Sequence, residues 1–221
     1  MLMRAVIFDL DGTLAETSGD LIAAANRCFA DLGLGALLDP QEDAATAMHG
    51  ARAMLRLGLS RVGEVDEADV DRQYPRLLAY YEEEIDRHST LFPGAMEAVA
   101  ELRRLGHPVA ICTNKPEALA EKLLDRLGVR GDFACLIGAD TLAMRKPDPE
   151  CLRETVRRAG GDPAHCVLVG DTETDRITAR AAGVPSILVR FGPNGHRTAD
   201  LHPEALIGHY DELVAAVQAL G

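Results

Sequence analysis

Short apolar runs alternate with amphipathic stretches along most of the chain. The apolar runs are residues 5–8, 107–112, 133–138, 165–170 and 185–190. The amphipathic stretches, with apolar residues at helical spacing, are residues 95–106, 116–128, 148–160, 174–183 and 210–220. The runs are apolar throughout rather than at every second position, which is typical of strands covered by helices on both faces. Strands that alternate with helices predict βαβ units and a parallel sheet.

Residues 16–90 follow a different pattern. They show helical spacing at residues 20–33, 51–58 and 68–88 and no clear strand, although they lie between the first strand and the next βα unit. We therefore predict an all-helical cap domain at residues 16–90, inserted into a catalytic core made of residues 1–15 and 91–221. The predicted fold class is α/β, a Rossmann-like doubly wound parallel sheet with this helical insertion.

Composition and charge narrow the class of protein. Hydrophobic residues form 47% of the 221 residues, which is enough for a sizeable core. A formal net charge of −12 argues against nucleic acid or an anionic membrane surface as the main partner. No apolar stretch approaches the roughly 18 residues that span a bilayer, and the five scattered cysteines form no CxxC pair. We expect a cytoplasmic protein with free thiols, either a monomer or a homodimer.

Polar residues gather where four of the predicted strands end. These residues are Asp9, Asp11 and Gly12 after the first strand, Thr113 and Asn114 after the second, Lys146 beyond the third, and Asp171 and Asp175 after the fourth. Ligands of an open parallel sheet bind at the carboxyl ends of its strands. We therefore expect these side chains to converge on one edge of the sheet, although they span residues 9–175.

Four carboxylates at one edge repel one another, and one lysine does not offset their charge, so a further cation is needed. Mg²⁺ prefers oxygen ligands and combines one or two carboxylates with waters and phosphate oxygens. The ammonium of Lys146, the hydroxyl of Thr113 and backbone N–H groups then remain for the other oxygens of a phosphoryl group. The residues therefore predict phosphoryl transfer, with Mg²⁺ as cofactor and a small phosphorylated metabolite as partner.

The same residues resemble the motifs of the haloacid dehalogenase superfamily of phosphohydrolases. The stretches "FDLDGT", "CTNK", "RKP" and "GDTETD" resemble its four motifs in order. The resemblance implies that Asp9 is the nucleophile and Asp11 the general acid and base, while Thr113 and Lys146 hold the phosphoryl group. The metal ligands that it implies are Asp9, Asp171 and the main-chain carbonyl of Asp11, with Asp175 in the outer shell.

Within this superfamily the chain is similar to bacterial phosphoglycolate phosphatases, as in "LFPGAMEAVAELRRLGH" and "GDTETDRITARAAGVPSILVRFG". The similarity implies hydrolysis of 2-phosphoglycolate through an aspartyl-phosphate intermediate. The expected substrate contacts are Gly12 and Asn114 in the core and Gly50 and Arg52 in the cap, where Arg52 or Arg56 would pair with the substrate carboxylate. Glu16 departs from the family, which often has aspartate there, at the expected hinge into the cap.

Other functions remain open at this point. A related phosphatase or a phosphomutase that acts on a sugar phosphate would share the same scaffold. A dehalogenase also uses an aspartate nucleophile, but it needs no metal, and Asp11 argues against it. A phospho-accepting receiver domain of a signalling protein brings similar residues to a sheet edge, but the helical insertion and the length of the chain argue against that class.

Overall fold

The computed structural model describes residues 3–220, which form two compact units. The core unit joins the residues up to Glu16 to those from Leu91 onward, and the helical unit comprises Thr17–Thr90. Two short strands pair where the chain passes from one unit to the other, β2 (Ala15–Glu16) and β3 (Thr90–Leu91).

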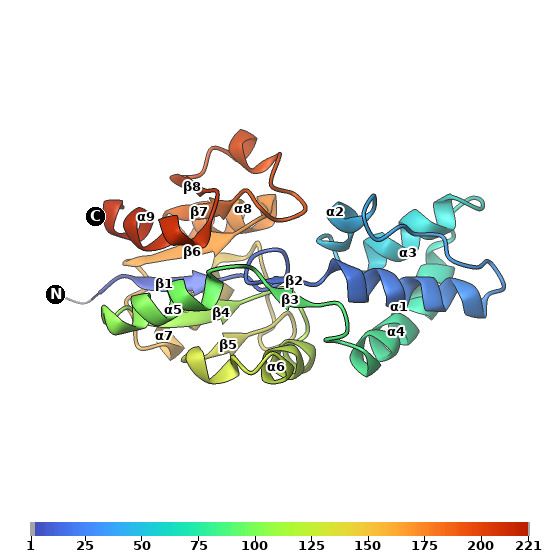
Figure 1. Cartoon of the computed structure of the whole chain (residues 1–221), viewed down its shortest axis with the longest axis horizontal. Coiled ribbons are helices and arrows are strands. Elements are labelled where there is room, and N and C mark those ends of the chain that lie inside the picture. Colours follow the sequence, from blue (N-terminus) through green and yellow to red (C-terminus); the bar gives the residue numbers. More distant parts are fainter. Residues whose placement is uncertain (1–2, 221) are drawn as a thin grey trace. The chain divides into compact units, whose positions relative to one another are not determined.

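A six-stranded parallel sheet forms the centre of the core unit (Figure 1). Its strands are β1 (Ala5–Phe8), β4 (Val109–Cys112), β5 (Leu136–Ile137), β6 (Cys166–Gly170), β7 (Ser186–Val189) and β8 (Ala205–Ile207). The helices around it are α5 (Ala95–Arg104), α6 (Glu117–Arg126), α7 (Pro149–Arg158), α8 (Glu173–Ala182) and α9 (Leu213–Ala219). The predicted α/β fold class, a doubly wound parallel sheet, is confirmed.

The strand order β5-β4-β1-β6-β7-β8 places the first strand in the middle of the sheet. From β1 the chain moves through β4 to β5 on one side, and it then crosses to β6, β7 and β8 on the other. The direction in which successive strands are added to the sheet therefore reverses beside β1. The loops that follow β1, β4 and β6 leave the sheet next to one another. Ligands of doubly wound sheets bind at this switch point.

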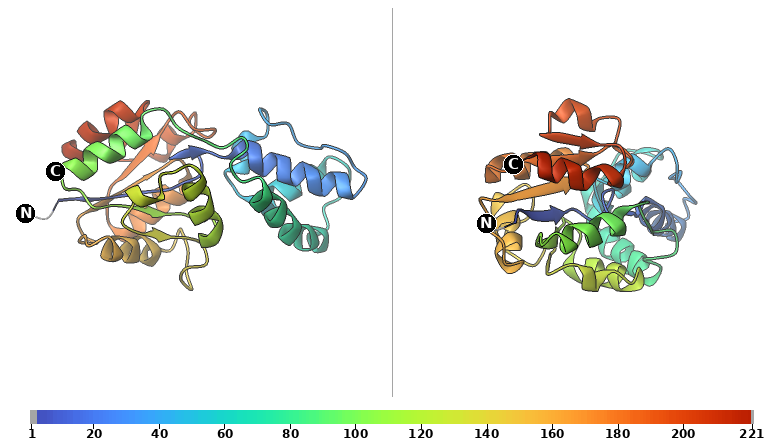
Figure 2. Two further views of the ribbon diagram at one scale, coloured as in Figure 1. Left: turned by 60° about the horizontal axis from the view of Figure 1, so that its bottom comes forward. Right: turned by 60° about the vertical axis from the view of Figure 1, so that its left-hand side comes forward.

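The sheet is covered on both faces, as its apolar strands predict. Ala5 and Ile7 belong to a buried cluster with Cys151 and Leu152 of α7, which packs beside α8. Because side chains alternate along a strand, Phe8 points to the opposite face, which α5 and α9 cover together (Figure 2). All five cysteines are free thiols, four of them buried.

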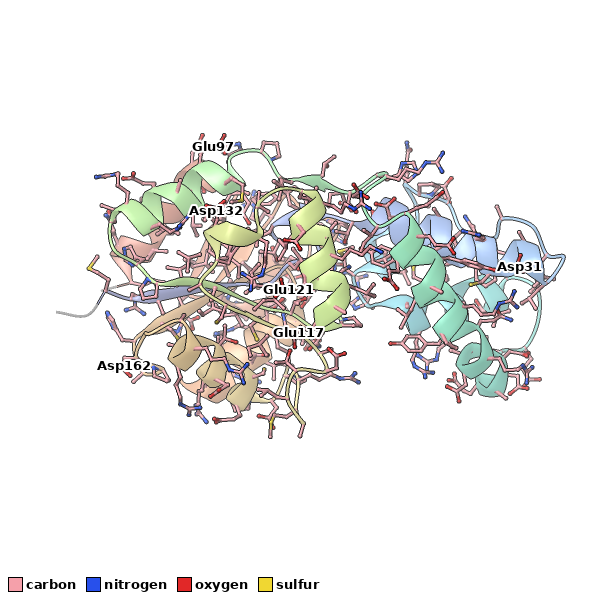
Figure 3. The ribbon with its side chains drawn as sticks, turned by 90° about the horizontal axis from the view of Figure 1, so that it is seen from below. Asp31, Glu97, Glu117, Glu121, Asp132 and Asp162 are labelled. Atoms are coloured by element: carbon pink, nitrogen blue, oxygen red, sulfur yellow. The ribbon has the colours of Figure 1, made fainter. Side chains whose placement is uncertain are left out.

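The helical unit is a small bundle with its own apolar interior. Its helices are α1 (Ser18–Asp31), α2 (Ala44–Ala47), α3 (Ala51–Ser60) and α4 (Glu67–Glu83). Gly58 of α3 lies so close to the ring of Phe29 that a Cβ there would meet it at 2.2 Å. At the end of α1, Asp31 accepts a hydrogen bond of 2.7 Å from Arg76 of α4 (Figure 3).

Several elements were not apparent in the amphipathic pattern. The edge strand β8 has only three residues in a polar surrounding, and α9 begins at Leu213 after a 3₁₀ turn, Tyr210–Glu212, rather than at residue 210.

Glu117 and Glu121 lie one turn apart on α6 (Figure 3), where Glu121 pairs with Arg130 at 2.5 Å. Within residues 3–220, none of the helices combines the length and the apolar character needed to cross a membrane.

Candidate active site

Three adjacent strands end beside one another and carry the polar residues of the site. Phe8 is level with Ile111 of β4 and with Val169 of β6. The next residues after β1 and β4 are Asp9 and Thr113, and Asp171 directly follows β6. The parallel register alone therefore brings side chains from residues 9, 113 and 171 to the same edge of the sheet.

The chain turns sharply after β1, and the turn needs a glycine. The Leu10 carbonyl accepts hydrogen bonds from three successive N–H groups at residues 13–15, and Gly12 adopts a φ of 77°. Only glycine adopts this left-handed conformation without strain. A second glycine, Gly192 in the loop after β7, packs closely against this turn. A Cβ at Gly192 would lie 2.6 Å from the Gly12 carbonyl oxygen.

Lys146 is the cation nearest to Asp9 among the described residues. It comes from the loop between β5 and α7, and its Nζ lies 2.9 Å from Oδ1 of Asp9 and 2.7 Å from Oδ1 of Asp175. Burial lowers the pKa of Lys146, but the carboxylates of Asp175 and Asp9 raise it above the ordinary lysine value, so its ammonium is charged. Burial also raises the pKa of Asp9 from 3.8 to about 6, although Lys146 lowers it.

Asp175 uses both of its carboxylate oxygens within the protein. Oδ1 pairs with Lys146, and Oδ2 accepts hydrogen bonds from the N–H and hydroxyl of Thr172, at 3.1 and 2.7 Å. Thr172 and Asp175 form the capping box that begins α8. A carboxylate with this many donors has little capacity left to bind a metal ion directly.

Asp171 differs from Asp175 in this respect. It is fully buried, its Oδ1 accepts a hydrogen bond of 3.1 Å from the Thr13 hydroxyl, and its Oδ2 has no hydrogen-bond partner. Burial and the negative charges of Asp175 and Asp9 raise the pKa of Asp171 well above its ordinary value. A buried carboxylate oxygen without a partner is costly, so this oxygen is a natural place for a cation.

The carboxylates of Asp9, Asp171 and Asp175 form a group compact enough to surround a divalent metal ion, with Asp9 and Asp171 able to bind it directly and Asp175 behind them. One carboxylate oxygen of each residue lies within 4.8 Å of the others, and all three residues are buried. Hard cations such as Mg²⁺ take oxygen ligands of this kind. The carboxylate of Asp11 is not one of this group, and its Oδ1 pairs with Nζ of Lys115 at 2.9 Å.

The loop after β4 adds a hydroxyl, an amide and a second lysine. Thr113 is buried, and its Oγ1 accepts a hydrogen bond of 3.1 Å from the Lys115 N–H. Asn114 is exposed, and its amide donates to the Lys146 carbonyl at 3.0 Å, which links the loops after β4 and β5. The Thr113 hydroxyl hydrogen is thus left to donate to a ligand at the sheet edge.

Two of the expected substrate contacts belong to the helical unit. Gly50 precedes α3 with a φ of 89°. Arg52 pairs with Asp71 at 2.5 Å, and its guanidinium lies 4.4 Å from the centre of the Tyr74 ring. Arg56 pairs with Glu67 at 2.7 Å. The substrate contacts of these residues stay predictions.

Four residues that contact the site were not among the predicted site residues. Thr13 binds Asp171, Lys115 binds Asp11, and Gly192 lies against Gly12. The buried Tyr210 donates a hydrogen bond of 2.8 Å to the Thr13 carbonyl. Thr13 and Lys115 stand within predicted motifs, so a search for polar neighbours of the expected residues would have found them, whereas Gly192 and Tyr210 are remote from every motif.

The family model and the curated relatives that match this chain indicate the same family of proteins. The family model of haloacid dehalogenase-like hydrolases matches residues 3–183. A phosphoglycolate phosphatase from Mesorhizobium japonicum is 40% identical over 94% of this chain and 92% of its own length. One from Agrobacterium fabrum is 38% identical over 98% and 93% of the two chains.

Solved structures agree on the fold. The crystal structure of a predicted phosphoglycolate phosphatase from Haemophilus somnus has a TM-score of 0.85 and covers 96% of this chain and 97% of that one. Its sequence is only 23% identical, so this likeness concerns the fold alone. The family match and the curated relatives together decide the class: the chain belongs to the haloacid dehalogenase-like hydrolases and is a phosphoric monoester hydrolase.

Proposed function

We propose that the chain is a Mg²⁺-dependent phosphatase that hydrolyses 2-phosphoglycolate through a phosphoryl group carried on Asp9. The observation that carries the proposal is the placement of Lys146 against Asp9, beside an Asp171 oxygen that has no hydrogen-bond partner. Such a site offers a nucleophile, a fixed cation and a place for a metal ion. The names of the curated relatives support 2-phosphoglycolate as the substrate.

The reaction has two steps, both of which use Asp9 and Asp11. In the first, a carboxylate oxygen of Asp9 attacks phosphorus, the bond from phosphorus to the ester oxygen breaks, and Asp11 gives its proton to that oxygen. In the second, Asp11 takes a proton from a water molecule as the water oxygen attacks phosphorus. The bond between phosphorus and Asp9 then breaks, which yields inorganic phosphate and restores both carboxyl groups.

Fixed donors hold the phosphoryl group during both steps. The Thr113 hydroxyl and the Lys146 ammonium donate to its oxygens, and the turn at Gly12 and the amide of Asn114 complete the contacts. Asp9, Asp171 and the Asp11 carbonyl would hold Mg²⁺, with Asp175 in the outer shell. When bound, the ion offsets negative charge on the carboxylates and on the phosphoryl oxygens.

The helical insertion at residues 16–90 is assigned the role of a cap that excludes water and contributes substrate contacts. Gly50 is the assigned backbone contact before α3, where no atom lies within 4 Å of a Cβ built at that position. Arg52 is the cap residue assigned to the substrate carboxylate, and it must share or exchange its present partner Asp71. The net charge of −12 and the free cysteines support a cytoplasmic enzyme that acts on a small metabolite.

Phosphate release from a panel of phosphate monoesters tests the proposal. With Mg²⁺ present we expect the highest kcat/KM for 2-phosphoglycolate, loss of activity with EDTA and recovery when Mg²⁺ is restored. The Arg52→Ala variant should raise KM for 2-phosphoglycolate. A higher kcat/KM for a sugar phosphate would replace the substrate, transfer of phosphate to a sugar hydroxyl would indicate a mutase, and full activity in EDTA would refute the metal requirement.

A further inference from the structure

The mechanism above leaves one buried cation of the site without a role. The side chain of Lys115 is only 4% exposed, and its Nζ lies 2.9 Å from Oδ1 of Asp11. Lys146 already pairs with the carboxylates of Asp9 and Asp175. Burying an ammonium is expensive unless its charge is used, so the position of Lys115 beside the proposed acid and base calls for an explanation.

The choice of lysine at this position is itself unusual in this chain. Of the 23 basic residues only three are lysines, namely Lys115, Lys122 and Lys146, and the rest are arginines. Lys115 and Lys146 are buried at the sheet edge, whereas Lys122 is a half-buried residue of α6. A compact ammonium, rather than a planar guanidinium, is thus found at both cationic positions of the site.

The backbone of Lys115 is held rigidly. Its N–H donates to Thr113 Oγ1, and its carbonyl accepts a hydrogen bond of 2.9 Å from the N–H of Ala139. Gly138 packs so closely that a Cβ there would lie 2.9 Å from the Lys115 carbonyl oxygen. The ammonium therefore extends from a fixed point toward Asp11, as expected of a side chain that recognises a ligand.

The partner of Lys115 indicates which part of a substrate it faces. In the proposed reaction Asp11 transfers a proton to the ester oxygen, so the leaving group lies one hydrogen bond of about 3 Å from that carboxyl group. Lys115 binds Oδ1 of the same carboxyl group. In 2-phosphoglycolate only one methylene group separates the ester oxygen from a carboxylate, which places that carboxylate within reach of the Lys115 ammonium.

We propose that Lys115 determines specificity by binding a negatively charged group on the leaving-group side of the substrate, so that the site favours phosphate monoesters of small hydroxy acids. This inference rests on the proposed phosphatase function. Without Lys115 such a group would meet the carboxylates of Asp9 and Asp11 and be repelled by them. A carboxylate has two oxygens, so a contact from Lys115 is compatible with a second contact from Arg52.

The test compares one charged and one neutral leaving group of the same shape. kcat/KM is measured for 2-phosphoglycolate and for its amide, in which a neutral carboxamide replaces the carboxylate. The ratio of the two values does not depend on the active fraction of a preparation, so partial misfolding of a variant does not affect it. The variants are Lys115→Met, which removes the charge, Lys115→Arg, which keeps it, and Lys122→Met as the matched control on α6.

We expect the wild type and Lys122→Met to prefer the charged substrate, and Lys115→Met to lower that preference about 10- to 100-fold, the worth of one charge-assisted hydrogen bond. Lys115→Arg should retain part of it. Equal losses for both substrates in Lys115→Met would mean that Lys115 only supports Asp11, and would overturn the inference while leaving the phosphatase intact. A wild type without preference for charge would also overturn it. If the wild type released phosphate from no monoester, the proposed function itself would fail.

Discussion

The Nζ atom of Lys146 lies 2.9 Å from Oδ1 of Asp9, and both residues are almost completely buried. This cation lowers the pKa of Asp9, yet burial has the larger effect, so that the pKa rises to about 6. The metal-free site therefore holds more negative charge than Lys146 alone compensates. That excess is the physical reason to expect a second cation, and it makes the stability of the protein depend on pH and on metal.

The pKa of Asp9 gives the sign of the pH dependence. Its folded-state value of about 6 exceeds the ordinary 3.8, so between these values the folded protein binds a proton that the unfolded chain does not. The metal-free protein should thus gain stability as the pH falls through about 6, and Asp9 should destabilise it above that pH. Mg²⁺ should stabilise it more at about pH 7.5 than at about pH 5, because metal binding competes with protons.

Urea unfolding of the wild type and of Asp9→Asn measures this, in EDTA and in Mg²⁺ at both pH values. The asparagine cannot ionise, so the difference in unfolding free energy between the two proteins isolates Asp9. We expect Asp9→Asn to be the more stable protein in EDTA at about pH 7.5 and to lose this advantage at about pH 5. An advantage that grows on acidification would contradict the assigned pKa direction.

Asp171 and Asp175 should respond to the same substitution in opposite ways. Asp171→Asn removes a buried charge whose Oδ2 has no partner, so it should stabilise the metal-free protein and abolish the stabilisation by Mg²⁺. Asp175→Asn weakens the pair with Lys146 and the cap of α8, which should destabilise the protein by about 1 kcal/mol or more. Thermal unfolding of both variants with and without Mg²⁺ measures the contrast. Similar shifts for the two variants would show that the carboxylates are not used differently.

Gly192 should affect catalysis from outside the sequence motifs. A Cβ at this position would lie 2.6 Å from the Gly12 carbonyl oxygen, which is a backbone atom and cannot rotate away. Gly192→Ala should therefore displace the turn that holds Asp11 and lower kcat/KM about 100-fold, the cost of a misplacement of about 1 Å. Gly131→Ala is the control, because a Cβ there has no atom within 4 Å. Unchanged kinetics in Gly192→Ala would mean that the turn adapts without cost.

Sequence alone predicts the parts of the site that the sheet geometry determines. Strand ends are readable from apolar runs, and parallel strands end side by side, so Asp9, Thr113 and Asp171 were expected at one edge. The fold class follows from the same pattern. β8 was missed because three apolar residues in a loop give no periodic signal.

Contacts between loops could not be predicted from the sequence, because no local pattern encodes them. The hydrogen bond from Thr13 to Asp171 and the approach of Gly192 to Gly12 join loops that are remote in sequence. The different use of the oxygens of Asp171 and Asp175 likewise depends on where Lys146 and Thr172 lie in space. The catalytic roles of the site residues stay predictions until kinetics test them.

The most direct test of the central claim is to detect a phosphoryl group on Asp9. In Asp11→Asn no base activates water, so p-nitrophenyl phosphate, whose leaving group needs little protonation, should give a burst of one nitrophenolate per active site. Acid quenching and peptide mass spectrometry should then find the phosphoryl group on Asp9, and the double variant with Asp9→Asn should show neither signal. Steady release without a burst, or a phosphoryl group on another residue, would contradict the account.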